Sequence, residues 1–176
     1  MDKYDMVFSG SGGQGVITAA IILAEAAVMF ENMHAVQSQS YGPEARGGAT
    51  RSDVIISTDE IYYPKVSHPN LLVCLTQLSF NNYSNIAIPG GYIITDSRFV
   101  NINISSDAII KELAIYDSVM DKIGNEIVLN MCMLGAVIKL TNIVHKNSII
   151  KVLEKRIPKK FIEMNEKAID LGMGLL

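Results

Sequence analysis

The chain opens with a short apolar run, a cluster of glycines and a long apolar run, in that order. Residues 4–8 (YDMVF) are typical of a buried strand, and four of residues 10–15 (GSGGQG) are glycine. Thirteen of residues 16–30 are apolar, without glycine or proline, which predicts a helix covered on most of its sides. Strand, glycine turn and helix make half of a Rossmann-like unit, so we expect an α/β fold.

The rest of the sequence continues this alternation. Residues 71–76 (LLVCLT) form the continuous apolar run of a strand buried on both faces of a parallel sheet. Residues 37–48 are polar and rich in small residues, which predicts an irregular exposed loop. We expect further strands at residues 52–57, 92–97 and near 113–117, a short helix over 78–86, and helices over 126–144, 147–156 and 159–172, with Asn125, Asn147 and Pro158 near their starts. The prediction is one Rossmann-like three-layer α/β domain spanning residues 1–176, with a mostly parallel sheet and C-terminal helices.

Composition and charge exclude several classes of function. The formal net charge is −3, which gives no electrostatic reason to expect binding to nucleic acid or to an anionic membrane. The run over 16–30 is shorter than the roughly 18–20 residues that a bilayer requires, and no signal peptide is apparent, so we expect a soluble protein. Cys74 and Cys132 are isolated in apolar runs, which excludes an iron–sulfur cluster or zinc site held by this chain alone and suits a reducing cytoplasm.

The glycine cluster has two interpretations. Gly10, Gly12 and Gly15 fit G-x-G-x-x-G between a strand and a helix, where backbone N–H groups bind phosphate. The acidic residue that binds ribose in dinucleotide sites is missing, because the chain reads HAVQSQS where it should lie. The Lys-Ser/Thr pair of a P-loop is also absent from GQGVIT. The alternative is that these glycines only permit a tight turn from strand to helix.

A second candidate segment, SYGPEARGGATRSD (residues 40–53), contains Arg46 and Arg51 among glycines and small residues. Arginine binds carboxylate or phosphate through two parallel hydrogen bonds. The alternative is a surface loop with an internal Glu44–Arg46 pair that contributes little stability. Neither interpretation supplies an acid, base or nucleophile, and the three histidines lie far apart in the sequence. We therefore predict no catalytic residue and no metal site in this chain, and any redox or acyl chemistry would belong to a cofactor held elsewhere.

Taken together, these motifs resemble a known family. GSGGQG after the first strand, QSYGPEARGG in the next loop and the following DEIYYPKV are similar to the γ subunit of 2-oxoacid:ferredoxin oxidoreductases. The closing segments NMCMLGAVIKLTNIV and MNEKAIDLG are also similar, so the resemblance spans essentially the whole chain. The form QSQSYGPEARGG looks most like the 2-oxoglutarate-type enzymes.

The resemblance implies a multi-subunit enzyme that oxidatively decarboxylates a 2-oxoacid to an acyl-coenzyme A and reduces ferredoxin. Thiamine diphosphate with Mg²⁺ would lie on α and β subunits, and [4Fe–4S] clusters on partners that include a ferredoxin-like δ subunit. The γ chain would help to form a shared coenzyme A site at the subunit interface. The alternatives are a pyruvate, ketoisovalerate or indolepyruvate oxidoreductase subunit, or a stand-alone nucleotide-binding oxidoreductase.

The family motif assigns candidate binding residues in both loops. They are Gly10, Gly12, Gly13, Gln14 and Gly15 in the first loop, and Tyr41, Gly42, Glu44, Arg46, Gly47 and Gly48 in the second. We expect the two loops to form one face where coenzyme A and the thiamine-binding subunits meet. An isolated chain could also self-associate through that face, which the partner subunits would otherwise cover.

Overall fold

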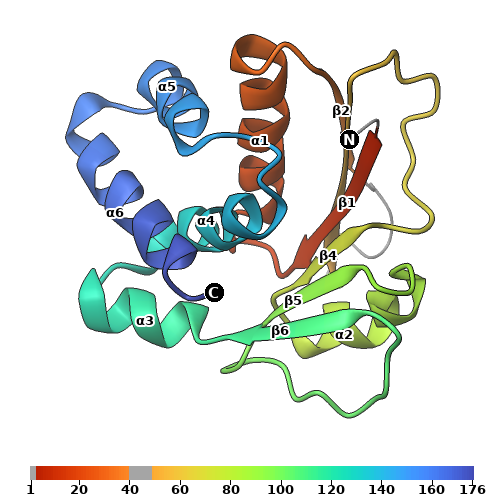
Figure 1. Ribbon diagram of the computed structural model, residues 1–176. Coiled ribbons are helices and arrows are strands. Elements are labelled where there is room, and N and C mark those ends of the chain that lie inside the picture. The colour runs from red at the N-terminus through yellow and green to blue at the C-terminus, as the bar shows by residue number, and fades with distance from the viewer. Residues whose placement is uncertain (1–2, 40–48) are drawn as a thin grey trace.

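A six-stranded sheet with the strand order β2-β3-β1-β4-β5-β6 forms the centre of the computed structural model, which describes residues 3–39 and 49–176 (Figure 1). The strands are β1 (Lys3–Gly10), β2 (His34–Gln39), β3 (Thr50–Ser57), β4 (Leu71–Cys74), β5 (Tyr92–Asp96) and β6 (Ile109–Leu113). β1, β4, β5 and β6 pair in parallel, whereas β3 is antiparallel to both β1 and β2. Of the described strands, β3 alone runs against the others, which confirms the predicted α/β fold with a mostly parallel sheet.

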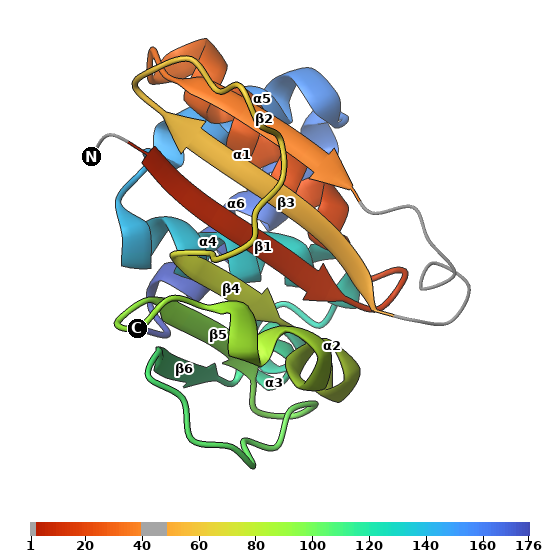
Figure 2. The ribbon, with the colours of Figure 1, turned by 90° about the vertical axis from the view of Figure 1, so that its right-hand side faces the viewer.

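Helices cover both faces of this sheet. They are α1 (Val16–Phe30), α2 (Gln77–Tyr83), α3 (Ile115–Lys122), α4 (Leu129–Thr141), α5 (Lys146–Arg156) and α6 (Ile162–Met173), with 3-10 turns at Ser84–Ile86, Glu126–Val128 and Lys159–Phe161. α1 and α3 to α6 lie on one face, and α2 lies on the other (Figure 1). Figure 2 shows the segment between β3 and β4 crossing the face that α2 shares. The result is the predicted three-layer arrangement.

The larger hydrophobic core lies between the sheet and α1, α4, α5 and α6. α1 and α4 are apolar on nearly every side because each is covered by other helices as well as by the sheet. α4 and α6 approach so closely that a Cβ at Gly172 would overlap the backbone carbonyl of Cys132. A smaller core on the opposite face is centred on Phe80 of α2.

Two expectations from the sequence are wrong in position. Residues 37–39 belong to β2, because their backbone continues the ladder with β3 as far as Gln39 opposite Ser52. Polar side chains are compatible with this edge strand, since Gln37 donates to the Ser52 hydroxyl (2.7 Å). The strand expected near residues 113–117 is β6, which ends at Leu113, and α3 begins at Ile115.

The starts of the helices have different causes. The carboxylate of Asp96, at the end of β5, accepts the Tyr116 N–H (2.9 Å) in the first turn of α3, which explains why a helix replaces the expected strand. Asn125 caps the turn before α4 as expected, because its side chain accepts the Ile127 N–H (3.1 Å). Asn147 caps nothing, since His145 is the residue before α5. Among the residues described, no helix has both the length and the apolar character needed to cross a bilayer.

Candidate functional site

The glycine loop joins β1 to α1 at the carboxyl edge of the parallel strands. β1 lies between β3 and β4, and the helix after β1 covers one face of the sheet while the helix after β4 covers the other (Figure 1). In open α/β sheets this change of face leaves a crevice outside the strand ends, and ligands bind there. The fold therefore places the loop where a ligand site is expected.

Gln14 braces the loop from inside. Its side-chain oxygen accepts the Ser11 N–H (2.7 Å), and its Nε2 donates to the Leu75 carbonyl just beyond β4 (3.4 Å). A Cβ at Gly10 would lie 2.5 Å from that side-chain oxygen, so only glycine leaves room for the brace. Gln14 thus links the ends of β1 and β4.

Gly15 marks the start of α1 and requires glycine for two reasons. Its φ is +70°, in the left-handed region, and a Cβ there would lie 2.6 Å from the Nδ2 of Asn130. The same Nδ2 donates to the Gly15 carbonyl (3.4 Å), which fixes the loop against α4. Asn130 was not identified from the sequence as a residue of the site. The signal that could have found it is its position as the one polar side chain in the apolar run VLNMCML.

The first turn of α1 is open to an anion. No side chain caps it, and it contains no acidic residue, so its N–H groups and the positive end of the helix dipole face a cavity of about 350 Å³. The described residues that line this cavity are Ser11, Gly12, Gly13, Gly15, Val16, Ile17, Thr18 and Thr50. None of these side chains is an acid, a base or an activated nucleophile. The cavity can bind a phosphate or carboxylate through its backbone, but its described walls supply no group for chemistry.

The candidate residues of the second loop, Tyr41, Gly42, Glu44, Arg46, Gly47 and Gly48, lie outside the described residues. The structure does place both flanks of that segment. β2 ends at Gln39, and β3 begins at Thr50, which pairs with Gly10 and lines the cavity. Figure 2 shows the end of β2, the start of β3 and the glycine loop at the same edge of the sheet.

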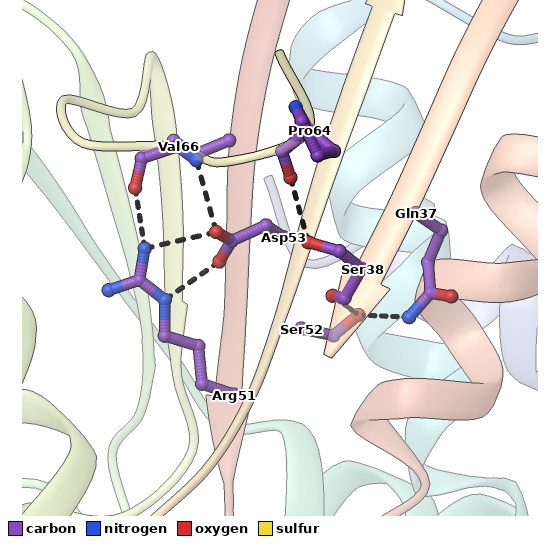
Figure 3. Close-up of polar contacts among 7 residues, drawn as sticks. All are labelled: Gln37, Ser38, Arg51, Ser52, Asp53, Pro64 and Val66. Atoms are coloured by element: carbon purple, nitrogen blue, oxygen red, sulfur yellow. Dashed lines mark hydrogen bonds and ion pairs between the residues drawn. The ribbon is translucent and has the colours of Figure 1, made fainter. Parts of the chain in front are cut away.

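Arg51 has a structural role. Its guanidinium forms an ion pair with Asp53 (Nε to Oδ1, 2.7 Å) and donates to the Val66 carbonyl (2.6 Å), as Figure 3 shows. Asp53 accepts the Val66 N–H in turn (3.0 Å), and the guanidinium lies over the Tyr83 ring. These contacts attach the segment before β4 to β3. The guanidinium of Arg51, considered above as a possible ligand contact, is therefore occupied by internal partners, with Asp53 as its ion-pair partner.

The remaining reactive side chains are not poised for chemistry. Burial raises the pKa of the Cys74 thiol to about 12, and burial together with the charge of Asp96 does the same for Cys132. Both are therefore thiols at neutral pH, and poor metal ligands. In residues 3–39 and 49–176, no group of three His, Cys, Asp or Glu side chains is arranged to hold a metal ion.

Comparison with known proteins gives consistent matches over almost the whole chain. Residues 5–175 match the family model described as pyruvate ferredoxin/flavodoxin oxidoreductase. The 2-oxoglutarate synthase subunit KorC of Methanocaldococcus jannaschii is 41% identical over 97% of this chain and 92% of its own.

Solved structures give the same result. The γ subunit of a keto/oxoacid ferredoxin oxidoreductase from Geobacter sulfurreducens superposes with a TM-score of 0.87 at 40% identity, covering 97% of this chain and 96% of that subunit. The 2-oxoglutarate:ferredoxin oxidoreductase of Magnetococcus marinus, solved with 2-oxoglutarate, coenzyme A and succinyl-CoA bound, shares the fold (TM-score 0.88, 18% identity). The superposition covers 99% of this chain and 31% of the longer Magnetococcus chain.

Proposed function

The chain belongs to the pyruvate ferredoxin/flavodoxin oxidoreductase family, and on that basis we propose that its 176 residues form one γ domain that completes the coenzyme A site of a 2-oxoacid:ferredoxin oxidoreductase. The observation that carries this proposal is the uncapped first turn of α1, which faces a cavity whose described walls offer main-chain N–H groups and no reactive side chain. Coenzyme A carries a pyrophosphate and a further phosphate, and a helix N-terminus is suited to bind such groups.

The cofactors that perform the reaction belong to partner subunits in this proposal. Thiamine diphosphate with Mg²⁺ lies on α and β subunits, and [4Fe–4S] clusters on a ferredoxin-like δ subunit pass electrons to ferredoxin. The buried thiols of Cys74 and Cys132, whose pKa values are raised to about 12, are consistent with this division. The assembled enzyme would work in the reducing cytoplasm, and this chain would supply binding and orientation.

The binding residues proposed for this chain come from both loops. Gly10, Gly12, Gly13 and Gly15 bring the backbone close to the ligand, and Gln14 holds their loop in shape. Tyr41, Gly42, Glu44, Arg46, Gly47 and Gly48 are assigned to the facing side, since the flanks of their segment lie beside the glycine loop. Arg46 would pair with a phosphate or with an acidic group of a partner.

The proposed substrate is 2-oxoglutarate. This assignment is supported by the 41% identity to a 2-oxoglutarate synthase subunit over nearly the whole of both chains. Pyruvate, ketoisovalerate and indolepyruvate remain the alternatives. Comparing the rates of the assembled enzyme with 2-oxoglutarate, pyruvate, a branched and an aryl 2-oxoacid separates them, and the highest kcat/KM with 2-oxoglutarate is expected.

The role of the cavity is tested with Thr18→Asp in the assembled enzyme. Thr18 is exposed in the first turn of α1 and lines the cavity. A carboxylate at this position favours the helix dipole but repels a phosphate, so the KM for coenzyme A should rise about fivefold or more, equivalent to about 1 kcal/mol, while the chain stays folded. Thr18→Asn, of similar size and neutral, is the control. An equal KM for coenzyme A in Thr18→Asp and Thr18→Asn would refute the phosphate site. A separate variant in the second loop, Arg46→Ala, is expected to lower turnover with coenzyme A.

A further inference from the structure

The outer edge of β2 is a candidate binding surface that lies apart from the glycine loop. β2 is the outermost strand of the sheet, and of the described strands only β3 pairs with it (Figure 2). Alternate backbone N–H and C=O groups on its outer side therefore point away from the sheet, where another strand can pair with them. We call this surface, residues 34–39, the β2 edge.

The β2 edge lacks the features that usually prevent strands from pairing between molecules. Its sequence, HAVQSQ, contains no proline and no lysine, arginine, aspartate or glutamate, and its pairing with β3 continues without a bulge. The strand at the opposite edge of the sheet, β6, carries Lys111 and Glu112. The two edges of one sheet therefore differ, and the β2 edge is the one suited to pairing with another strand.

A groove of about 370 Å³ runs beside the β2 edge. Residues 33–36 line it, together with Val28 from α1 on one face of the sheet and residues 60–62 from the segment that crosses the other face (Figure 2). Val28 is 51% exposed and Tyr62 is 88% exposed, although both are large side chains with apolar surface. The one carboxylate in this lining, on Glu60, accepts the Tyr62 hydroxyl (2.8 Å). An added strand would therefore lie between largely apolar walls.

α1 presents an apolar stripe toward the same edge. Ile17, Ile21, Ala24 and Val28 lie on one face of the helix, because they are spaced by four, three and four residues. Val28 lines the groove, so this face of α1 is directed toward the β2 edge. Ile17 and Ile21 are partly exposed. A lone added strand would pair with β2 but would leave most of this stripe in contact with water.

A second copy of this chain would cover the strand and the stripe together. A two-fold axis perpendicular to the sheet, beside Val36, pairs the two β2 strands in antiparallel with Val36 opposite itself, and no like charges meet because the edge has none. α1 lies over β2 and β3. With strands about 5 Å apart, each α1 would lie about 5 Å from the axis and the two helices about 10 Å apart, which is the spacing of packed helices.

We propose that two copies of this chain associate through the β2 edge. Their β2 strands pair in antiparallel, so that one sheet continues from β6 of one copy to β6 of the other, and the apolar stripes of α1 pack together on one face. Because the paired strands run in opposite directions, the two glycine loops lie at opposite ends of the joined sheet, and each can meet its own partner subunits. The inference goes beyond the proposed function, which assigns no contact between copies of this chain.

The first test measures self-association of the purified chain by sedimentation equilibrium, where a dimer is expected. Val36→Lys places two like charges directly opposite each other and should raise the Kd of the dimer about tenfold. Val36 is partly exposed and belongs to neither hydrophobic core, so the variant should stay folded by circular dichroism. The matched control is Ile109→Lys on β6, where the side chain is 46% exposed. A monomeric unmodified chain, or an equal Kd for the two variants, would overturn the proposal.

A disulfide across the two-fold axis tests the register. Opposite residues of an antiparallel pair have Cα atoms about 4.5–5.5 Å apart, which is within the range of a disulfide. Val36→Cys should therefore give a covalent dimer on mild oxidation, and the more exposed control Ile109→Cys should not. The native thiols of Cys74 and Cys132 are buried and should not contribute.

Equal yields of covalent dimer from the two cysteine variants would overturn the proposal. A cross-link from Val36→Cys to a different subunit alone, in the assembled enzyme, would overturn it as well, because the β2 edge would then belong to that subunit. A chain that dimerises through the β2 edge but binds no thiamine-binding subunit would contradict the proposed function and leave this inference standing.

Discussion

Replacing Gly15 by alanine is the sharpest test of how the glycine loop is built. The change adds one methyl group at the residue that starts α1, where φ is +70°. It also directs that methyl group at the side chain of Asn130, with the Nδ2 at 2.6 Å and the Cγ at 2.9 Å. The substitution therefore perturbs the backbone and the contact with α4 together.

The expected cost has two parts. A non-glycine residue in the left-handed region costs about 1–2 kcal/mol. Moving Asn130 aside breaks its bond to the Gly15 carbonyl, worth about 1 kcal/mol. We expect Gly15→Ala to lower the free energy of unfolding by about 2–3 kcal/mol, and Tm by about 4–12 °C in a chain of this size.

The assay is urea unfolding of the isolated chain followed by circular dichroism, with Gly12→Ala as the matched control. Gly12 lies in the same loop, its φ is not positive and an added Cβ meets nothing within 4 Å, so its replacement should be nearly neutral. The double variant Gly15→Ala/Asn130→Ala should show coupling, because removing the amide removes the steric part of the cost. Equal stability of Gly15→Ala and Gly12→Ala would refute this account of the loop. It would also be refuted if the effects of Gly15→Ala and Asn130→Ala on the free energy of unfolding were strictly additive in the double variant.

Two further predictions concern the helices that support the site. Gly172→Ala should destabilise the chain by about 1–3 kcal/mol in thermal unfolding, because its methyl group would overlap the backbone of α4. Gly174→Ala is the control and should have little effect, because the nearest atom to an added Cβ there is the Leu171 carbonyl oxygen at 3.4 Å. Equal Tm values for the two variants would contradict the close crossing of α4 and α6. Burial alone would raise the pKa of the Glu31 carboxyl, but hydrogen bonds from the Ser148 hydroxyl and the His145 backbone outweigh it and lower this pKa. The lowered pKa means that the folded chain favours the ionised carboxylate, so this contribution to stability is present above pH 4.5 and is lost as the carboxylate becomes protonated. Glu31→Gln should therefore be less stable than the unmodified chain at pH 7, and the difference in the free energy of unfolding should shrink as the pH falls below 4.5. A difference that stays constant from pH 7 to pH 3 would exclude this contribution.

The fold could be predicted from the sequence where a local pattern determines it. The glycine turn and α1 could be predicted because thirteen of the fifteen residues 16–30 are apolar and follow a glycine cluster. Few local structures other than a turn and a buried helix are compatible with that pattern. The direction of β3 could not be found in this way. An apolar run such as VIIS is compatible with either direction, and the antiparallel pairing depends on contacts with β1 that lie far away in the sequence.

The candidate site was predicted only in part for the same reason. The glycines identify the loop, but its geometry depends on Leu75 and Asn130, which come from β4 and α4. Arg51 is the opposite case, since its partner Asp53 is two residues away. Both members were visible in the sequence, but only the strand geometry shows that alternate residues share a face.

The position of β3 between β1 and β2 has a consequence for nucleotide chemistry. In the ordinary dinucleotide-binding order, the second strand is the immediate neighbour of the first, so an acid at its end reaches the ribose of a nucleotide on the glycine loop. Here the hairpin formed by β2 and β3 moves the end of β2 one strand further out, about 10 Å from β1 instead of about 5 Å. An aspartate introduced at Gln39 would therefore lie one strand further from β1 than the ribose-binding acid of a dinucleotide site does. The strand order itself, and not only the missing carboxylate, separates this chain from the dehydrogenases with which it shares a glycine motif.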